Sequence, residues 1–173
     1  AIIEHPDVRR MILRMKSLTE GVRALLYYCA GQVDRGNLGD SAAKARADIL
    51  VPLVKAWGTD VGVEVSGIGI QVHGGMGFVE ETGAAQHWRD SRIAPIYEGT
   101  NGIQAADLVT RKLGLEGGEP MIALFEDIAR DAAAESALAA LAQDCADIAR
   151  WMQDEASLDD RLAGSVPFCT MSA

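Results

Sequence analysis

A glutamate in a short glycine-containing loop is the first residue of this sequence that could do chemistry. Glu98 stands in the run Tyr97-Glu98-Gly99-Thr100, directly ahead of a segment with helical spacing. A carboxylate held in a water-poor slot against a carbon-bound proton can act as a general base. A solvated loop acid or a helix cap is the alternative interpretation, and these four residues alone leave both open.

A glycine cluster is the second candidate. Gly74, Gly75 and Gly77 follow Gln71 at the end of an apolar run with helical periodicity. Glycine lets a backbone approach a ligand closely and adopt positive φ. An isolated G-G-x-G pattern is also common at a helix C-cap and turn, so the glycines by themselves favour neither a ligand nor a turn.

Three separated motifs, in one order and spacing, carry a resemblance to a known family. They are Q-V-H-G-G-M-G-F at 71–78, Arg89-Asp90, and I-Y-E-G-T at 96–100 followed by Ile103-Gln104. Together they resemble the C-terminal helical domain of acyl-CoA dehydrogenases, flavoproteins that desaturate acyl thioesters. The resemblance implies that residues 1–113 form this domain, incomplete at its N-terminus. Residues 114–173 are similar to the start of a helical extension in a subgroup handling long-chain or methylthio-substituted acyl thioesters, and we expect this extension to be truncated.

The resemblance assigns roles to residues of both motifs. Glu98 would be the base that removes the proton alpha to the thioester carbonyl while the beta carbon gives a hydride to FAD, and Gly99 would lie beside the substrate. The implied FAD-binding residues are Gln71, Val72, His73, Gly74, Gly75, Thr100 and Gly102. The segment 71–75 typically meets the adenine side of an FAD bound mainly by the neighbouring subunit. We further expect Glu98 and the Gly74–Gly75 turn to border one cleft.

Two functions follow from different readings of the same residues. In the first, the chain is part of an FAD-dependent acyl-CoA dehydrogenase whose N-terminal and middle domains are missing, so that this piece would not turn over alone. Its partners would be an acyl-CoA substrate, an electron acceptor such as a flavoprotein, and further copies in a homo-oligomer. In the second, the chain is a non-catalytic helical assembly or dimerisation module, and Glu98 is incidental.

Composition excludes several classes of function. The formal net charge of −9 and the pI near 4.7 disfavour nucleic acid or an anionic membrane as a partner. Charges or glycines interrupt every apolar run, so we expect no membrane span. The odd number of cysteines, Cys29, Cys145 and Cys169, shows no ligand spacing. We therefore expect buried thiols in a reducing cytoplasm, and no metal site.

Low aromatic content, abundant alanine and helical periodicity predict an all-α protein, a helical bundle of the acyl-CoA dehydrogenase C-terminal type with an added C-terminal helix. The expected helices run over about 6–33, 41–72, 81–92, 100–113 and 120–155. A turn-rich loop is expected over 34–40, and Pro52 should cause a kink or a break near Leu50. A short segment near 158–162 and an apolar tail would follow; we expect either that the native chain continues past Ala173 or that this tail docks on something. Ala84, Ala85 and Trp88 are expected to face inward. Ile103, Ala106, Val109 and Leu113 are expected to share one side of their helix. Arg89 and Asp90 are interpreted as an architectural ion pair or helix-end contacts.

Overall fold

The computed structural model describes all 173 residues, and every regular element in it is a helix, which confirms the predicted all-α class. The α-helices are α1 Pro6–Asn37, α2 Ser41–His73, α3 Gly75–Phe78, α4 Ala84–Ser91, α5 Asn101–Asp107, α6 Glu119–Asp131, α7 Ser136–Asp154 and α8 Leu158–Ser172. Short 3-10 turns lie at Ile2–Glu4, Glu80–Thr82 and Leu115–Gly118, and a π-turn at Leu108–Lys112 continues α5.

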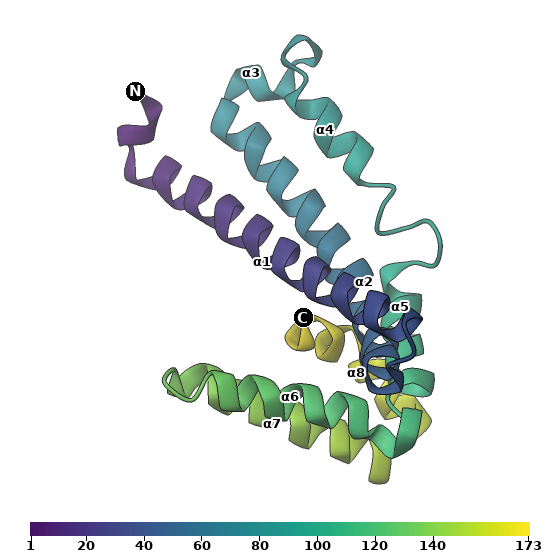
Figure 1. Cartoon of the computed structure of the whole chain (residues 1–173). Coiled ribbons are helices and arrows are strands. Elements are labelled where there is room, and N and C mark those ends of the chain that lie inside the picture. Colours follow the sequence, from purple (N-terminus) through teal and green to yellow (C-terminus); the bar gives the residue numbers. More distant parts are fainter.

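Helices α1 and α2 form a long antiparallel hairpin (Figure 1). The Asp40 side chain caps α2 by accepting a hydrogen bond from the Ala43 amide at 2.9 Å, and Arg35 pairs with the same carboxylate at 2.7 Å. An added Cβ at Gly36 would lie 3.1 Å from the Lys44 Cα, a tight contact, so glycine helps the two helices to approach closely here. The predicted loop over 34–40 is therefore too long, because α1 continues through Asn37.

Of the kink or break predicted near Leu50, the break is wrong, since α2 is continuous from Ser41 to His73 with Pro52 inside it. Proline inside a helix removes one backbone hydrogen bond and costs roughly 3 kcal/mol. Pro52 is buried between the fully buried Leu50 and Leu53. Burial of these apolar side chains offsets the lost hydrogen bond, so tertiary packing keeps the helix whole.

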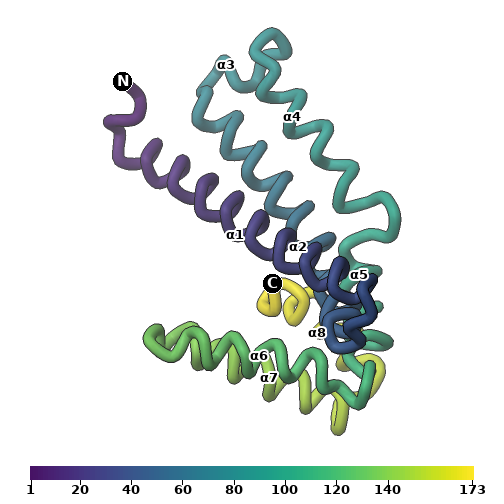
Figure 2. The backbone as a smooth tube through the Cα atoms, in the orientation of Figure 1, coloured from purple at the N-terminus to yellow at the C-terminus, as the bar shows by residue number.

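Helix α2 is the element against which most of the fold packs. Helices α1, α3, α4, α5, α6 and α8 all contact it. After the turn at α3, the chain doubles back through α4 along the C-terminal half of α2, and a loop then leads to α5 (Figure 2). The glycine cluster and the Tyr97–Thr100 loop are thus fixed at different heights along one long helix.

The single helix predicted over 120–155 is wrong, because α6 and α7 form an antiparallel pair separated by residues 132–135. Alanine-rich sequence favours a helix locally. The chain turns instead because this lets both helices bury side chains in the same core. Phe125 on α6 and Met152 on α7 both lie in that core. Likewise α8 runs through Ser172, and the apolar tail docks by burying Phe168 and Cys169.

One core cluster of buried residues joins both parts of the chain, across the boundary at Leu113. Its members are Cys29, Ile49, Leu50, Leu53, Ala56, Ala105, Leu108, Val109, Leu113, Met121, Leu124, Phe125, Cys145, Ala146, Ala149, Met152, Phe168 and Cys169. The rings of Phe125 and Phe168 meet edge to face with centroids 6.2 Å apart. All three cysteines are buried and free, as predicted, and burial raises the pKa of Cys169 to about 11, with a smaller contribution from Asp60. The division at residue 113 remains a prediction.

Trp88, which was predicted to face inward, is not buried, and neither is Ile103 on the side that it shares with Val109 and Leu113. Trp88 is 40% exposed and Ile103 is 61% exposed, whereas Ala85, Val109 and Leu113 are buried as expected. Trp88 is nevertheless packed on α2, since a Cβ added at Gly67 would lie 3.4 Å from its ring, so α2 covers this side chain in part. None of the helices combines the length and the apolarity needed to cross a bilayer.

We predict that Phe168→Ala lowers the free energy of unfolding by about 3–5 kcal/mol, because it removes one ring of the buried aromatic pair and leaves a cavity. Urea unfolding followed by circular dichroism measures this. Leu158→Ala on the same helix is the control; Leu158 is 60% exposed and should cost less than about 1 kcal/mol. Equal losses for the two variants would contradict the assigned docking of α8.

Asp127 on α6 should make stability depend on pH. Hydrogen bonds from Arg130 and Arg46 hold the pKa of this carboxyl below its ordinary 3.8, and the Arg46 contact ties α6 to α2. A pKa lowered by folding adds stability above the unfolded-state value, and this stability is lost as the pH falls through the folded-state value. Asp127→Asn should therefore cost at most about 1 kcal/mol near neutral pH, since the carboxylate is partly exposed.

In urea titrations at several pH values, the difference between wild type and Asp127→Asn should shrink as the pH falls below 3.8 through the lowered folded-state pKa. Asp131→Asn, which removes an exposed carboxylate on the same helix, is the control and should show no such pH-dependent gap. A constant gap across the whole pH range would mean that the charge of Asp127 is not what stabilises the contact.

Candidate functional site

The loop that carries Glu98 has an unusual backbone. Glu98 has φ 52° and Gly99 has φ 87°, and Glu116 is the one other non-glycine residue with positive φ. The left-handed conformation costs a residue with a Cβ roughly 1–2 kcal/mol. The Glu98 side chain is exposed. Because such strain persists only where surrounding groups enforce it, the contacts of this loop decide how Glu98 is presented.

Three hydrogen bonds hold the loop. The Lys55 Nζ on α2 donates to the Gly99 carbonyl oxygen at 2.6 Å. The Gln104 Nε2 donates to the Glu98 carbonyl oxygen at 3.4 Å. The backbone N–H of Asn101 donates to the Pro95 carbonyl oxygen at 3.0 Å. Hydrogen bonds therefore hold the carbonyl groups of both Glu98 and Gly99, and a third bond ties Asn101 to Pro95 across the loop.

Asn101 links this loop to the middle of α2. Its Oδ1 accepts from Lys55 Nζ at 2.8 Å, and its Nδ2 donates to the Ala56 carbonyl oxygen at 2.9 Å and to Asp60 Oδ1 at 2.8 Å. Thr59 Oγ1 lies within 3.2 Å of both ends of the amide. Sequence analysis missed Lys55 and Asn101. The one available signal was that Lys55 is the sole Lys or Arg between Arg46 and Arg89.

Thr100 and Gly102 lie beside the predicted base. Thr100 caps α5, because its Oγ1 accepts a hydrogen bond from the Ile103 amide at 3.2 Å. Gly102 is exposed on the first turn of that helix. The structure thus gathers Glu98, Gly99, Thr100 and Gly102 on one loop and helix start.

The glycine cluster forms the end of α2, and its members differ in what they require. Gly74 has φ 62° and ψ −145°, a conformation essentially restricted to glycine. An added Cβ at Gly77 would overlap the carbonyl oxygen of Ile70, so this glycine serves the packing of α3 on α2. At Gly74 and Gly75, no atom lies within 4 Å of the Cβ position, and both residues are exposed.

The other residues predicted to meet FAD surround this turn. Gln71 and His73 are exposed, Val72 is half-buried, and His73 Nδ1 lies 2.7 Å from the Gly69 carbonyl oxygen. Bare, accessible backbone at Gly74 and Gly75 lets a ligand or a partner chain approach closely. This surface therefore fits contact with one end of a dinucleotide.

The two groups of predicted residues do not meet within one chain. Lys55 holds the Glu98 loop and His73 ends α2, so they are separated by 18 helical residues, about 27 Å at 1.5 Å per residue. Figure 1 shows α3 and α5 well apart along α2. None of the larger pockets is lined by both groups. The expected single cleft around Glu98 and the glycine turn is thus absent from the single chain.

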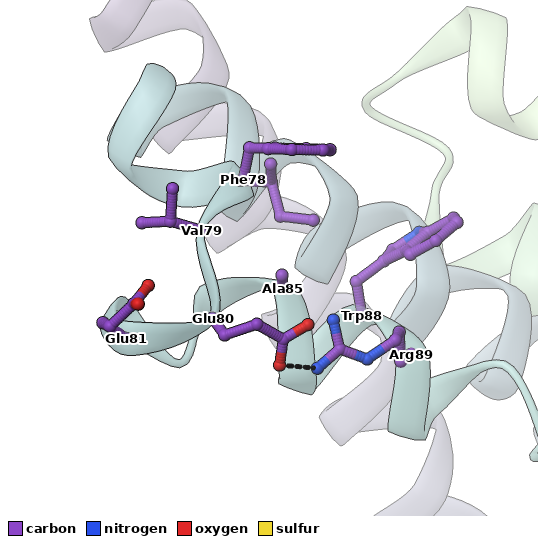
Figure 3. A pocket seen from close by; sticks show the side chains of 8 residues that line it. Phe78, Val79, Glu80, Glu81, Ala85, Trp88 and Arg89 are labelled. Atoms are coloured by element: carbon purple, nitrogen blue, oxygen red, sulfur yellow. Dashed lines mark hydrogen bonds and ion pairs between the residues drawn. The ribbon is translucent and has the colours of Figure 1, made fainter.

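A pocket of about 560 Å³ lies beside the glycine turn (Figure 3). Phe78 and Trp88 are among its apolar side chains, and Arg89 pairs with Glu80 at 2.8 Å at its edge. The partner of Arg89 is therefore Glu80 rather than Asp90. Because both side chains of the pair are exposed, it contributes little to stability.

Comparison with known proteins decides the family. The model of the acyl-CoA dehydrogenase C-terminal domain matches residues 1–113. The chain belongs to the acyl-CoA dehydrogenase family. This confirms the resemblance drawn from the three motifs.

Several characterised acyl-CoA dehydrogenases are similar to this chain. It is 54% identical over 132 residues to the 3-methylmercaptopropionyl-CoA dehydrogenase of Ruegeria pomeroyi, covering 74% of this chain and 22% of that protein. It is 41% identical over 126 residues to a butyryl-CoA dehydrogenase of Syntrophomonas wolfei, covering 69% and 20%. It is 36% identical over 124 residues to a broad-specificity linear acyl-CoA dehydrogenase of Mycobacterium tuberculosis, covering 68% and 20%. The chain spans about a fifth of the length of these relatives.

In this acyl-CoA dehydrogenase domain, Gly99→Ala should destabilise the fold by about 1–2 kcal/mol. The substitution puts a Cβ at φ 87° and 3.2 Å from Gln104 Nε2, next to a residue that is already strained. Gly102→Ala is the matched control: it lies on the first turn of α5, where its Cβ would be 3.7 Å from Thr100 Oγ1. Alanine there should be neutral or stabilise by up to about 1 kcal/mol. Thermal unfolding of both variants measures this, and an indifferent Gly99→Ala would refute the assigned loop conformation.

Proposed function

We propose that this chain is the C-terminal helical part of an FAD-dependent acyl-CoA dehydrogenase, with Glu98 as the catalytic base. The observation that carries the proposal is the loop at Glu98 and Gly99: an exposed carboxylate stands on a strained backbone that Lys55, Asn101 and Gln104 hold from three sides. An incidental surface acid needs no such support. The family match and the similarity to named acyl-CoA dehydrogenases support the same reaction class.

The base would act on the carbon alpha to a thioester carbonyl. The carbon–hydrogen bond breaks, the proton moves to a carboxylate oxygen of Glu98, and the electron pair forms the new double bond as the beta carbon loses a hydride. The negative charge that develops on the thioester oxygen is stabilised by a donor already in place, for which we propose the backbone N–H of Glu98. When bound, FAD supplies the acceptor for the beta hydride. Gly99, which has no side chain, leaves room for the substrate beside the base.

The predicted cofactor residues fall into two groups with different tasks. We assign Thr100 and Gly102 to the FAD nearest Glu98. We assign the group from Gln71 to Gly75 to an FAD held mainly by a neighbouring subunit, because about 27 Å of α2 separates it from the base. This assignment implies a homo-oligomer, with acyl-CoA as substrate and a flavoprotein-type electron acceptor. We also propose a cytoplasmic location, and that the 173-residue chain alone neither retains FAD nor turns over.

An assembly module is the second candidate, and the exposed apolar side chains favour it. Phe78 is 82% exposed and Tyr27 is 69% exposed, on different parts of the surface. An oligomeric enzyme would also bury such side chains, so the two functions separate only on chemistry. The role of Glu98 is the point on which they differ.

We predict that Glu98→Gln, made in the FAD-loaded enzyme that contains this domain, keeps its yellow flavin but loses about 10²- to 10⁴-fold in the rate at which acyl-CoA bleaches it, because the amide cannot take the proton. Anaerobic stopped-flow spectroscopy with butyryl-CoA and 3-methylmercaptopropionyl-CoA measures the rate. Glu116→Gln is the matched control, since Glu116 is also an exposed glutamate with positive φ. Wild-type bleaching by Glu98→Gln would remove Glu98 from the mechanism and favour the assembly module.

A further inference from the structure

We propose that Lys55 is a positioning residue for Glu98: its ammonium selects the left-handed backbone at Glu98 and Gly99 and so sets where the carboxylate points. This inference rests on the proposed role of Glu98 as the base. It adds a residue that none of the three sequence motifs contains. Lys55 touches neither substrate nor the reacting atoms in this account, and it acts only through the loop.

The anchor of this contact is a continuous helix that packs into the core. Lys55 stands in the middle of α2, between the fully buried Leu53 and the buried Ala56. The loop that it holds has little support of its own, because Ile96, Tyr97 and Glu98 are all exposed. The short bond from Lys55 to the Gly99 carbonyl oxygen therefore fixes the loop relative to α2.

A cation suits this position better than a neutral donor. The lysine ammonium offers three donors from one compact atom, and two of them meet the Gly99 carbonyl oxygen at 2.6 Å and Asn101 Oδ1 at 2.8 Å. Charge-assisted hydrogen bonds are about twice as strong as neutral ones. The side-chain amide of Asn101 in turn donates to Asp60 Oδ1, so the Asp60 carboxylate balances the charge of the Lys55 ammonium through Asn101.

Removing the ammonium should release both acceptors at once. With Lys55→Met, the Gly99 carbonyl oxygen loses its side-chain donor and Asn101 Oδ1 keeps only Thr59. Of the bonds that hold the loop, those from Gln104 to the Glu98 carbonyl oxygen and from the Asn101 backbone to Pro95 remain. With the strongest bond lost, Glu98 relaxes more readily out of its strained φ toward the right-handed region, which L-residues prefer. The carboxylate would still be present and ionisable, but it would spend less time aligned with the substrate.

The test compares Lys55→Met with Lys112→Met in the FAD-loaded enzyme. Lys112 is the matched control, because it is also half-buried and also reaches α2, where its Nζ lies 3.3 Å from Asp48 Oδ1. At saturating butyryl-CoA, Lys55→Met should slow flavin reduction by about 10- to 100-fold. Its flavin content and its half-saturating substrate concentration should stay near those of wild type, and Lys112→Met should reduce flavin at the wild-type rate. An unchanged rate in Lys55→Met would overturn the proposal.

A double-mutant cycle separates this inference from the proposed function. If Lys55 acts through Glu98, Lys55→Met should slow flavin reduction no further in the Glu98→Gln background. An equal loss in both backgrounds would mean that Lys55 acts elsewhere, and would overturn the inference while leaving Glu98 as the base. If Glu98→Gln alone reduces flavin at the wild-type rate, the proposed function itself fails.

A measurement of structure in the same preparations completes the test. Hydrogen exchange at the amides of residues 97–104 should be faster in Lys55→Met than in Lys112→Met, because the bonds that order the loop are lost. Unchanged exchange, with the loop as protected as in wild type, would contradict the claim that Lys55 holds it.

Discussion

The bond between the Lys55 ammonium and the Gly99 carbonyl oxygen is the contact on which this account depends. It joins the long helix against which most of the fold packs to the loop that carries Glu98 on a strained backbone. The rest of the fold supports that bond by holding α2 in place. Helices α1, α5, α6 and α8 pack on α2, which stays continuous through Pro52. A kinked α2 would move Lys55 relative to α5, and the loop would lose its anchor. The packing of the core therefore determines, through α2 and Lys55, where the Glu98 carboxylate lies.

The length of α2 has a second consequence. It separates the glycine turn at Gly74 from the Glu98 loop by a distance that no side chain spans, so the predicted cofactor residues cannot act on one point within one chain. An extended dinucleotide and a second subunit are the simplest way to use both groups. The open backbone at Gly74 and Gly75 and the exposed Phe78 nearby are consistent with a surface that a second molecule covers.

Local patterns predicted the parts of this protein that depend on local physics. Periodicity placed α1 and α2 almost completely. The family resemblance carried by the three motifs is confirmed, whereas the roles that it implies for Glu98, Gly99 and the glycine turn remain predictions. The failures have a common cause in tertiary contacts. Burial of Leu50 and Leu53 overrides Pro52, and the shared core forces a turn at 132–135 despite its alanines. Lys55 lies 44 residues before its partner, and that partner is a backbone carbonyl, so no side-chain pattern could pair them.

The most direct measurement of the central claim is a crystal structure of the FAD-loaded enzyme with an unreactive acyl-CoA analogue bound. The account predicts a carboxylate oxygen of Glu98 about 3–3.5 Å from the alpha carbon, with Lys55 still bonded to the Gly99 carbonyl oxygen. A Glu98 side chain turned to solvent, with another residue against the alpha carbon, would contradict it.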